Sequence, residues 1–304
     1  MNEQIQTIIE KYTVDKYQIA VISATVSIIT VLVTNWIKNY FDSKLHLGKL
    51  KTDHRFQEQK KIKEAIAKYK VHLVSACDDL NHRLWSIARN HQEGWLNIEG
   101  NYQKESHYFH SSAYRILAVF AWVKKIEKEM IFLDTTIAEK EDMEFIKFLK
   151  IFPQLFCNLS FLGGINPRGT HATDHFFRNN FEILSDSLIV DDKIQSYGEF
   201  KSTIPQTVTQ LKPIYVYLDH VSPNENRLRW DRLHLFNLTL IAFLNNYGYD
   251  FQKTNEEKIK AVLQTPRKSP LLGNYLRFLA EYHLDQNTEI KKLAKIIRNI
   301  EGQP

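Results

Sequence analysis

The chain contains few of the residues that build turn-rich or cross-linked folds. Among its 304 residues only 10 are glycine, 8 are proline and 2 are cysteine. A β-sandwich or barrel needs a turn after every short strand, so this shortage of turn-forming residues argues against a loop-rich β fold. Cys77 and Cys157 lie far apart in the sequence, which is typical of free thiols in a reducing cytoplasm rather than of a disulfide framework.

Recognisable catalytic signatures are also missing. The sequence has no phosphate-binding GxxxxGK[ST], no dinucleotide-binding GxGxxG, no nucleophile elbow GxSxG, no HExxH and no CxxC. No cofactor is therefore predicted, and a non-enzymatic role is favoured over catalysis. The sequence indicates a location and an architecture more directly than a reaction.

The most informative feature present is an uncharged run near the N-terminus. Residues 19–37, IAVISATVSIITVLVTNWI, are nineteen positions without a charge. At ~1.5 Å per helical residue they reach ~28 Å, close to the thickness of a bilayer's hydrocarbon core. Tyr17 at one end and Trp36 and Tyr40 at the other are typical interface anchors. The pattern predicts a transmembrane helix over residues 19–41.

A cleaved signal peptide and a buried soluble helix are the alternatives to a retained span. A signal peptide begins with basic residues and ends at a small-residue cleavage site. Residues 1–18 instead carry three acids against two lysines, and the residues at the end of the run are bulky rather than small, namely Asn35, Trp36 and Ile37. The retained span is the favoured interpretation, with residues 1–18 as a short extracytoplasmic segment.

The charge that follows the run predicts the orientation. Residues 38–70 hold ten Lys and Arg against four acids, a balance of 10 − 4 = +6. By the positive-inside rule, we expect a single-pass membrane protein with residues 69–304 in the cytoplasm. Residues 42–68 are then a basic juxtamembrane helix. Four lysines are expected to contact lipid headgroups, although a solvated helix face explains them almost as well: Lys38, Lys44, Lys49 and Lys51.

One face of the predicted span carries small and hydroxyl residues. Ser23, Ser27, Thr30 and Thr34 are spaced by four, three and four residues, and Ala20 lies on the same face. Small residues let membrane helices approach closely, and hydroxyls can bond across the contact, so this membrane seam predicts a homo-oligomer. The alternative is that each hydroxyl bonds its own helix backbone and faces lipid.

The remainder of the chain has the apolar spacing of helices. We expect a long helix over 43–92, which Gly48 could interrupt, a helix over 105–133, and one over 139–162 that Pro153 kinks or splits. Residues 213–218, PIYVYL, are the only strand candidate. The prediction is an all-α protein with one N-terminal transmembrane helix, a long juxtamembrane helix and a cytoplasmic multi-helix bundle. Shorter helices are expected at 170–189, 206–219, 226–247, 255–264, 270–285 and 287–300.

The densest cluster of titratable residues is His171, Asp174 and His175. In a helix the two histidines would lie one turn apart, which is compatible with zinc binding. A third ligand is not evident, and capping of a helix start by Thr170 or Thr173 explains the region as well. These residues are weak metal candidates, and a surface or partner-contacting role is favoured.

The segment from Arg229 to His234, RWDRLH, resembles the motif of the helical HEPN nucleases. In that family an Arg and a His from a dimer cleave RNA through its own 2′-hydroxyl, so the resemblance implies Arg229 and His234 as catalytic candidates. Trp230 departs from the small polar residue usual after the arginine. Other pairs fit the same loose pattern: Arg168 and His175, Arg227 and His234, and Arg277 and His283. The favoured role of Arg229 is to hold helices together through hydrogen bonds. Nucleic acid is an open alternative as a partner, but no other sequence feature supports it.

Two further segments resemble a widespread group of bacterial membrane proteins. YKVHLVSACDDLNHRLWSIARN (69–90) and HYFHSSAYRILAVFAWVKKIEKEMIFLD (107–134) look like helices of single-span proteins with a basic stalk and a helical cytoplasmic domain. The resemblance covers about residues 20–190 and implies no activity. With a single predicted span, a helical body and an Arg and His pair, the chain also resembles the HEPN-like membrane accessory proteins of type VI CRISPR systems. Those proteins assemble pores during phage defence.

Three functions follow as hypotheses. The first is a membrane-anchored oligomeric effector, for which phage defence is one setting. It perturbs the inner membrane, or forms a pore in it, when its cytoplasmic domain receives a signal. The second is a membrane-tethered HEPN-type ribonuclease, and the third is a non-catalytic membrane scaffold. The expected partners are the lipid bilayer, further copies of the chain, and a protein or signal ligand that the sequence does not identify.

Overall fold

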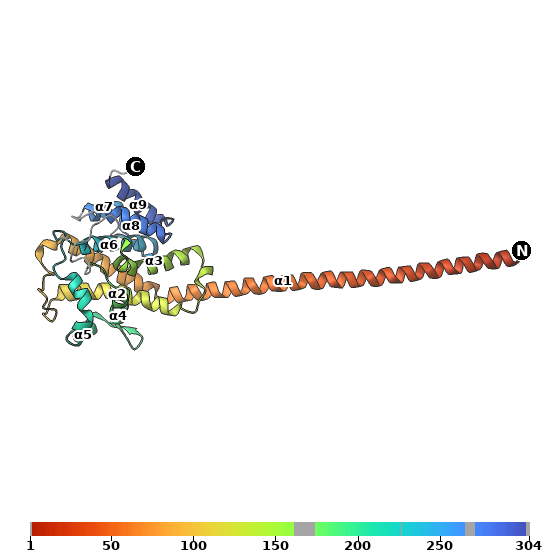
Figure 1. The fold of residues 1–304 in the computed structure, drawn as a ribbon, viewed down its shortest axis with the longest axis horizontal. Coiled ribbons are helices and arrows are strands. Elements are labelled where there is room, and N and C mark those ends of the chain that lie inside the picture. The colour runs from red at the N-terminus through yellow and green to blue at the C-terminus, as the bar shows by residue number, and fades with distance from the viewer. Residues whose placement is uncertain (1, 161–173, 226, 265–270, 302–304) are drawn as a thin grey trace. The chain divides into compact units, whose positions relative to one another are not determined.

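A computed structural model describes residues 2–160, 174–225, 227–264 and 271–301 (Figure 1). Its contacts divide the chain into two units, residues 1–58 and residues 59–304. Helix α1 (Asn2–Arg89) belongs to both units. Each unit is described by itself.

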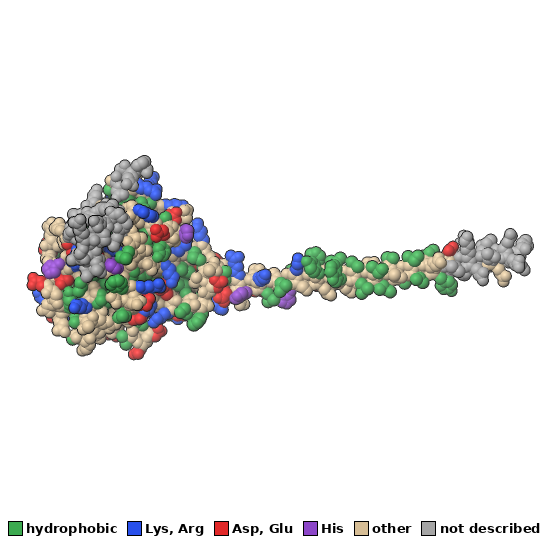
Figure 2. Space-filling model, viewed as in Figure 1, with side chains coloured by type: hydrophobic (Ala, Val, Ile, Leu, Met, Phe, Trp, Pro, Cys, Tyr) green, Lys and Arg blue, Asp and Glu red, His purple; other side chains and the backbone are tan. Residues whose placement is uncertain are grey.

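The first unit consists of the N-terminal part of α1. Side chains from residue 15 to residue 57 are exposed throughout, and Figure 2 shows the apolar ones along this helix. Gly48 does not interrupt the helix, so the expected break there is wrong. A glycine in a helix interior costs only about 1 kcal/mol relative to alanine, which a helix of this length tolerates.

The second unit is a helical domain, as predicted. With α1, the described part of the chain contains nine α-helices, so the all-α prediction is confirmed. Short 3₁₀ turns connect several of them, including η1 (His91–Glu93), η2 (Thr135–Ile137) and η5 (Asp250–Gln252). The helices after α1 are α2 (His107–Glu129), α3 (Lys140–Cys157), α4 (Arg178–Asp186), α5 (Tyr197–Leu218), α6 (Arg229–Tyr247), α7 (Glu256–Gln264), α8 (Leu271–Glu281) and α9 (Thr288–Glu301).

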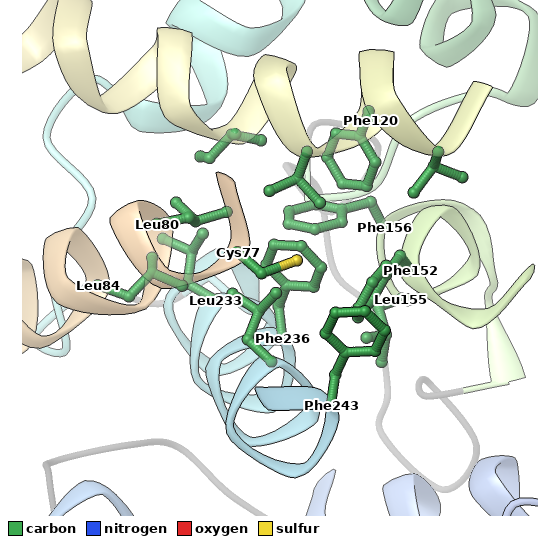
Figure 3. Close-up of a cluster of buried hydrophobic side chains, with 14 of the residues drawn as sticks. Cys77, Leu80, Leu84, Phe120, Phe152, Leu155, Phe156, Leu233, Phe236 and Phe243 are labelled. Atoms are coloured by element: carbon green, nitrogen blue, oxygen red, sulfur yellow. The ribbon is translucent and has the colours of Figure 1, made fainter. Parts of the chain in front are cut away.

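Helix α6 is the central helix of this domain. Nearly all of its residues are buried, and it contacts α3, α7, α8 and α9. Its Phe236 ring lies 5.6 Å from Phe120 of α2 and 5.0 Å from Phe156 of α3. Such aromatic contacts add to the stabilisation from area burial alone. Figure 3 shows this core, to which α1, α2, α3 and α6 contribute Cys77, Leu80, Leu84, Phe120, Phe152, Leu155, Phe156, Leu233, Phe236 and Phe243.

Three prolines lie inside helices without ending them. Pro153 lies within α3, so of the two predicted effects, a kink or a split of the 139–162 helix, the split does not occur. Pro205 and Pro213 lie within α5, which begins well before the predicted residue 206. The Ser196 hydroxyl accepts a hydrogen bond from the Glu199 N–H, and the Glu199 carboxylate accepts one from the Ser196 N–H. This capping box fixes the start of α5.

The strand prediction is also corrected. Residues 213–218 belong to α5, because a short apolar run fits a buried helix as well as a strand. The described part of the chain instead has one two-stranded antiparallel hairpin, β1 (Ile189–Val190) and β2 (Lys193–Ile194). Asp191 and Asp192 between the strands have φ of 48° and 61°. Two successive positive φ values are typical of the tight turn that joins hairpin strands.

Candidate membrane segment and predicted site residues

The candidate membrane segment is the part of α1 that begins at Asp15. In the described residues it is the one helix that is long and apolar enough to cross a membrane, and none of its apolar window is buried. By length and composition it could be a span or a signal sequence. Ile19, Leu32 and Trp36 are 67%, 63% and 70% exposed. The structure therefore does not show the alternative in which this segment is a buried helix of the chain's own core.

Aromatic rings follow the apolar run. The rings of Trp36 and Tyr40 stack at 6.1 Å, and Tyr40 also contacts Phe41 edge-on at 5.9 Å. The Lys44 ammonium lies 4.8 Å from the centre of the Tyr40 ring. Aromatic rings beside lysines are typical of the boundary between hydrocarbon and headgroups.

The basic residues after the run fall into two groups. Lys63 and Lys68 lie in the second unit and pair with Glu139 and Glu129 at 2.8 and 3.0 Å. Residues 38–57 carry five cations against two acids, a balance of 5 − 2 = +3. Their exposed lysines form no ion pair with another described residue: Lys38, Lys44, Lys49 and Lys51. The positive charge nearest the apolar run is thus free to contact anionic headgroups.

The residues of the predicted membrane seam lie on one exposed face of α1. The Ser27 hydroxyl donates to the Ser23 carbonyl at 2.8 Å, and the Thr30 hydroxyl donates to the Val26 carbonyl at 2.7 Å. This is the backbone bonding expected under the alternative to a seam. It uses the hydroxyl proton only, and each oxygen keeps acceptor capacity for a second helix. Ala20 and Thr34 are exposed on the same face.

Arg229 is buried at the start of α6, with 3% of its surface exposed. Its Nε and Nη2 donate to the Glu225 carboxylate at 2.8 and 2.6 Å. Its Nη1 donates to the carbonyls of Val216 and Tyr217, at 2.8 and 2.9 Å, in the last turn of α5. Carbonyls at a helix C-terminus lack partners within the helix, so Arg229 joins the end of α5 to the start of α6.

His234 is buried on α6. Its Nδ1 lies 3.0 Å from the Trp230 carbonyl oxygen, and its ring lies 4.8 Å from the Trp230 ring. A nuclease needs its arginine and histidine within hydrogen-bond reach of a scissile phosphate. Arg229 and His234 are both more than nine-tenths buried, which favours a structural role for this pair over RNA cleavage.

The metal candidates are only partly described, because His171 lies outside the described residues. Asp174 is buried, and its carboxylate accepts hydrogen bonds from Arg227 Nε at 2.7 Å and from the Leu228 N–H at 2.9 Å. His175 is half-buried, and its ring contacts Phe177 at 5.3 Å. Among the described residues no three His, Cys, Asp or Glu side chains form a metal-binding group. Asp174 holds the start of α6.

A set of three arginines at the start of α6 was not predicted as a unit. Arg232 donates from Nη1 to the Leu155 carbonyl at 2.7 Å and from Nη2 to the Asn158 carbonyl at 2.9 Å, at the end of α3. Burial lowers the pKa of Arg232. Together with Arg227 and Arg229 it forms what we name the arginine clamp. The three side chains bind three preceding segments, and the only sequence signal is the arginine-rich string RLRWDR.

Comparison of the chain with protein-family models, curated proteins and solved structures finds no significant match. The resemblances to single-span bacterial proteins and to HEPN nucleases therefore stay predictions.

Proposed function

We propose that this protein is a membrane-anchored oligomeric effector of the bacterial inner membrane. A helical cytoplasmic domain receives a signal, and the membrane segments of several copies then perturb or open the bilayer. The observation that carries the proposal is the fully exposed apolar run of α1 over residues 19–37. An apolar surface of this length needs lipid or protein to cover it.

The flanking residues support one orientation. The uncompensated lysines of residues 38–57 follow the run, and the positive-inside rule holds them in the cytoplasm. The rings of Trp36 and Tyr40 would then lie at the cytoplasmic interface of the membrane. Residues 59–304 form a packed domain on that side.

Oligomerisation supports an active role over a passive anchor. One apolar helix alone offers no polar lining for ions, whereas several helices that meet at the membrane seam would bring hydroxyls together. Ser27 and Thr30 already satisfy their protons within the helix, so the residual oxygen lone pairs would face the contact. A passive scaffold needs no such polar face.

The test has two parts on the full chain. Fusions of a cytoplasm-specific fluorescent reporter and a periplasm-specific phosphatase to the C-terminus report its orientation, and a membrane-potential dye reports depolarisation on expression. We expect a cytoplasmic C-terminus and depolarisation. A periplasmic C-terminus would overturn the orientation, and normal potential at high expression with every ligand tested would leave the scaffold as the better function.

A further inference from the structure

A pocket of about 480 Å³ opens within the second unit, between the C-terminal turns of α1, η5 and α7. Four of its lining residues on α1 recur at helical spacing and share one face: Asp78, His82, Trp85 and Arg89. The opposite wall comes from η5 and α7 and includes Phe251, Lys253 and Lys258.

The two walls are tied to each other. Gln252 Nε2 on η5 donates to Asp78 Oδ2 on α1 at 3.2 Å, and Gln252 Oε1 accepts the Tyr249 N–H at 2.9 Å. At Gly248 a Cβ would lie 2.6 Å from the Leu244 carbonyl oxygen, so the turn from α6 into η5 requires glycine. The hydrogen bond between Gln252 and Asp78 joins η5 to α1 at the pocket.

The pocket carries an excess of positive charge. Its cations are Arg89, Lys253 and Lys258, and its one carboxylate is Asp78. Arg89 and Lys258 are exposed and form no ion pair with a described acid, while Lys253 pairs with the exposed Asp250 at 2.8 Å. Three cations against one carboxylate favour an anionic ligand.

Aromatic rings stand on both walls. Trp85 is half-buried on α1, and Phe251 is 83% exposed on η5. The Phe251 ring stacks on Tyr249 at 5.5 Å with 11° between the planes. Rings held in this way are platforms on which a flat heteroaromatic ligand stacks.

A buried polar atom lies beside these groups. Asn81 lines the pocket and is 4% exposed, and its Oδ1 accepts no hydrogen bond from the described residues. Buried acceptors in proteins normally have a donor. An N–H group of a bound ligand would supply one.

We propose that this pocket binds a purine nucleotide. The base stacks on Trp85 and Phe251, its amine donates to Asn81, and the phosphate contacts Arg89 and Lys258. That the nucleotide is the activating signal rests on the proposed function, whereas binding itself does not. Trp85 and Arg89 belong to α1, the helix that also carries the apolar run, so the ligand would act on the C-terminal end of that helix.

The larger cavity, about 630 Å³ between α6, α7 and α9, lacks these features. Its rim balances Glu256 and Glu289 against Lys292 and Lys295, and no aromatic residue lines it. This cavity therefore favours neither an anionic ligand nor a flat aromatic one, in contrast to the pocket at α1.

The test is calorimetric titration of the full chain in lipid nanodiscs with AMP, GMP and ATP, and with adenosine and inorganic phosphate as partial probes. We expect at least one nucleotide to bind about tenfold or more tightly than either partial probe, a difference typical of one lost charged or stacking contact. Failure of all three nucleotides to bind, or equal binding of adenosine and its nucleotide, would overturn the proposal.

Two exposed residues provide variants that should fold normally. Phe251→Ser and Lys258→Glu should each weaken nucleotide binding about tenfold. Their matched controls, Phe132→Ser and Lys212→Glu, lie on other surfaces and should bind as the unaltered chain does. Equal affinity of the pocket variants and controls would contradict the site.

Dye release from liposomes, measured on the same preparations, separates this proposal from the effector proposal. Nucleotide binding without dye release under any condition would support the pocket and contradict the effector function. Dye release without nucleotide binding would support the effector function and contradict the pocket.

Discussion

Two helical stretches of nineteen residues, 19–37 of α1 and the whole of α6, are rich in apolar residues but have different surroundings. The first is exposed throughout, and the second is buried nearly throughout. The first contains no charge, whereas α6 contains Arg229, Asp231 and Arg232. Both arginines bond carbonyls of neighbouring helices. A helix buried in protein can carry charges because the protein supplies partners, which lipid does not.

The largest effect is expected from removing a buried charge from α6. Arg229→Ala should lower the free energy of unfolding of the helical domain by about 3–5 kcal/mol, because the Glu225 carboxylate and two α5 carbonyls lose their donor. Thermal unfolding followed by circular dichroism measures the loss. Arg55→Ala, on the exposed part of α1, is the control and should leave the melting temperature unchanged.

The same variant separates structure from catalysis. If Arg229→Ala and His234→Ala both kept the melting temperature of the unaltered chain and abolished RNA cleavage, the ribonuclease hypothesis would replace the structural one. We expect Arg229→Ala to destabilise strongly. We expect His234→Ala to destabilise less, since its hydrogen bond to the Trp230 carbonyl and its ring contact with Trp230 leave no buried charge unpaired when they are lost.

The converse change is to add a charge to the exposed helix. Ile28→Lys puts an ammonium near the middle of the apolar run, which should disfavour membrane insertion by about 2.5–3.5 kcal/mol. Alkaline extraction of membranes should then release more of the protein. Val71→Lys, at an exposed position of the same helix in the second unit, should extract as the unaltered chain does. Equal extraction of all three would mean that residues 19–37 do not lie in the bilayer.

How far sequence analysis succeeds depends on whether the signal is local. The apolar run and the helical periodicity are local, and the all-α prediction based on them is confirmed. The start of α5 also has a local signal, because Ser196 and Glu199 have the spacing of a capping box. The sequence prediction nevertheless placed the start of this helix at residue 206. The β1–β2 hairpin was missed because two-residue strands are too short to show an alternating pattern.

Contacts between distant residues were not predictable from this sequence. Arg232 bonds carbonyls at residues 155 and 158, and Arg227 bonds Asp174, so the arginine clamp exists only once α3 and α6 have packed. The pocket at α1 likewise joins residues 78–90 with residues 251–258. Prolines are tolerated inside α3 and α5 because tertiary packing outweighs one lost backbone hydrogen bond, and this packing is not visible in the local sequence.

A smaller effect tests how local capping compares with core packing. Ser196→Ala removes the hydroxyl of the α5 capping box and should lower the free energy of unfolding by about 1 kcal/mol. For a domain of this size that corresponds to a fall of about 2–4 °C in melting temperature. Ser202→Ala, at an exposed position within the same helix, is the control. A loss as large as that of Arg229→Ala would contradict the ranking of the arginine clamp above the cap.

The central claim is that the exposed helix assembles in the membrane through its seam. The most direct measurement is dye release from liposomes that contain the full chain, the seam variant Ser27→Leu with Thr30→Leu, or the control Val26→Leu with Ile29→Leu. Both pairs keep the segment apolar, but only the first removes the two hydroxyl oxygens that can accept a hydrogen bond from a second helix, worth ~0.6 kcal/mol each, and fills the close contact. The account predicts reduced release for the seam variant and unaltered release for the control. Equal release from all three would contradict it.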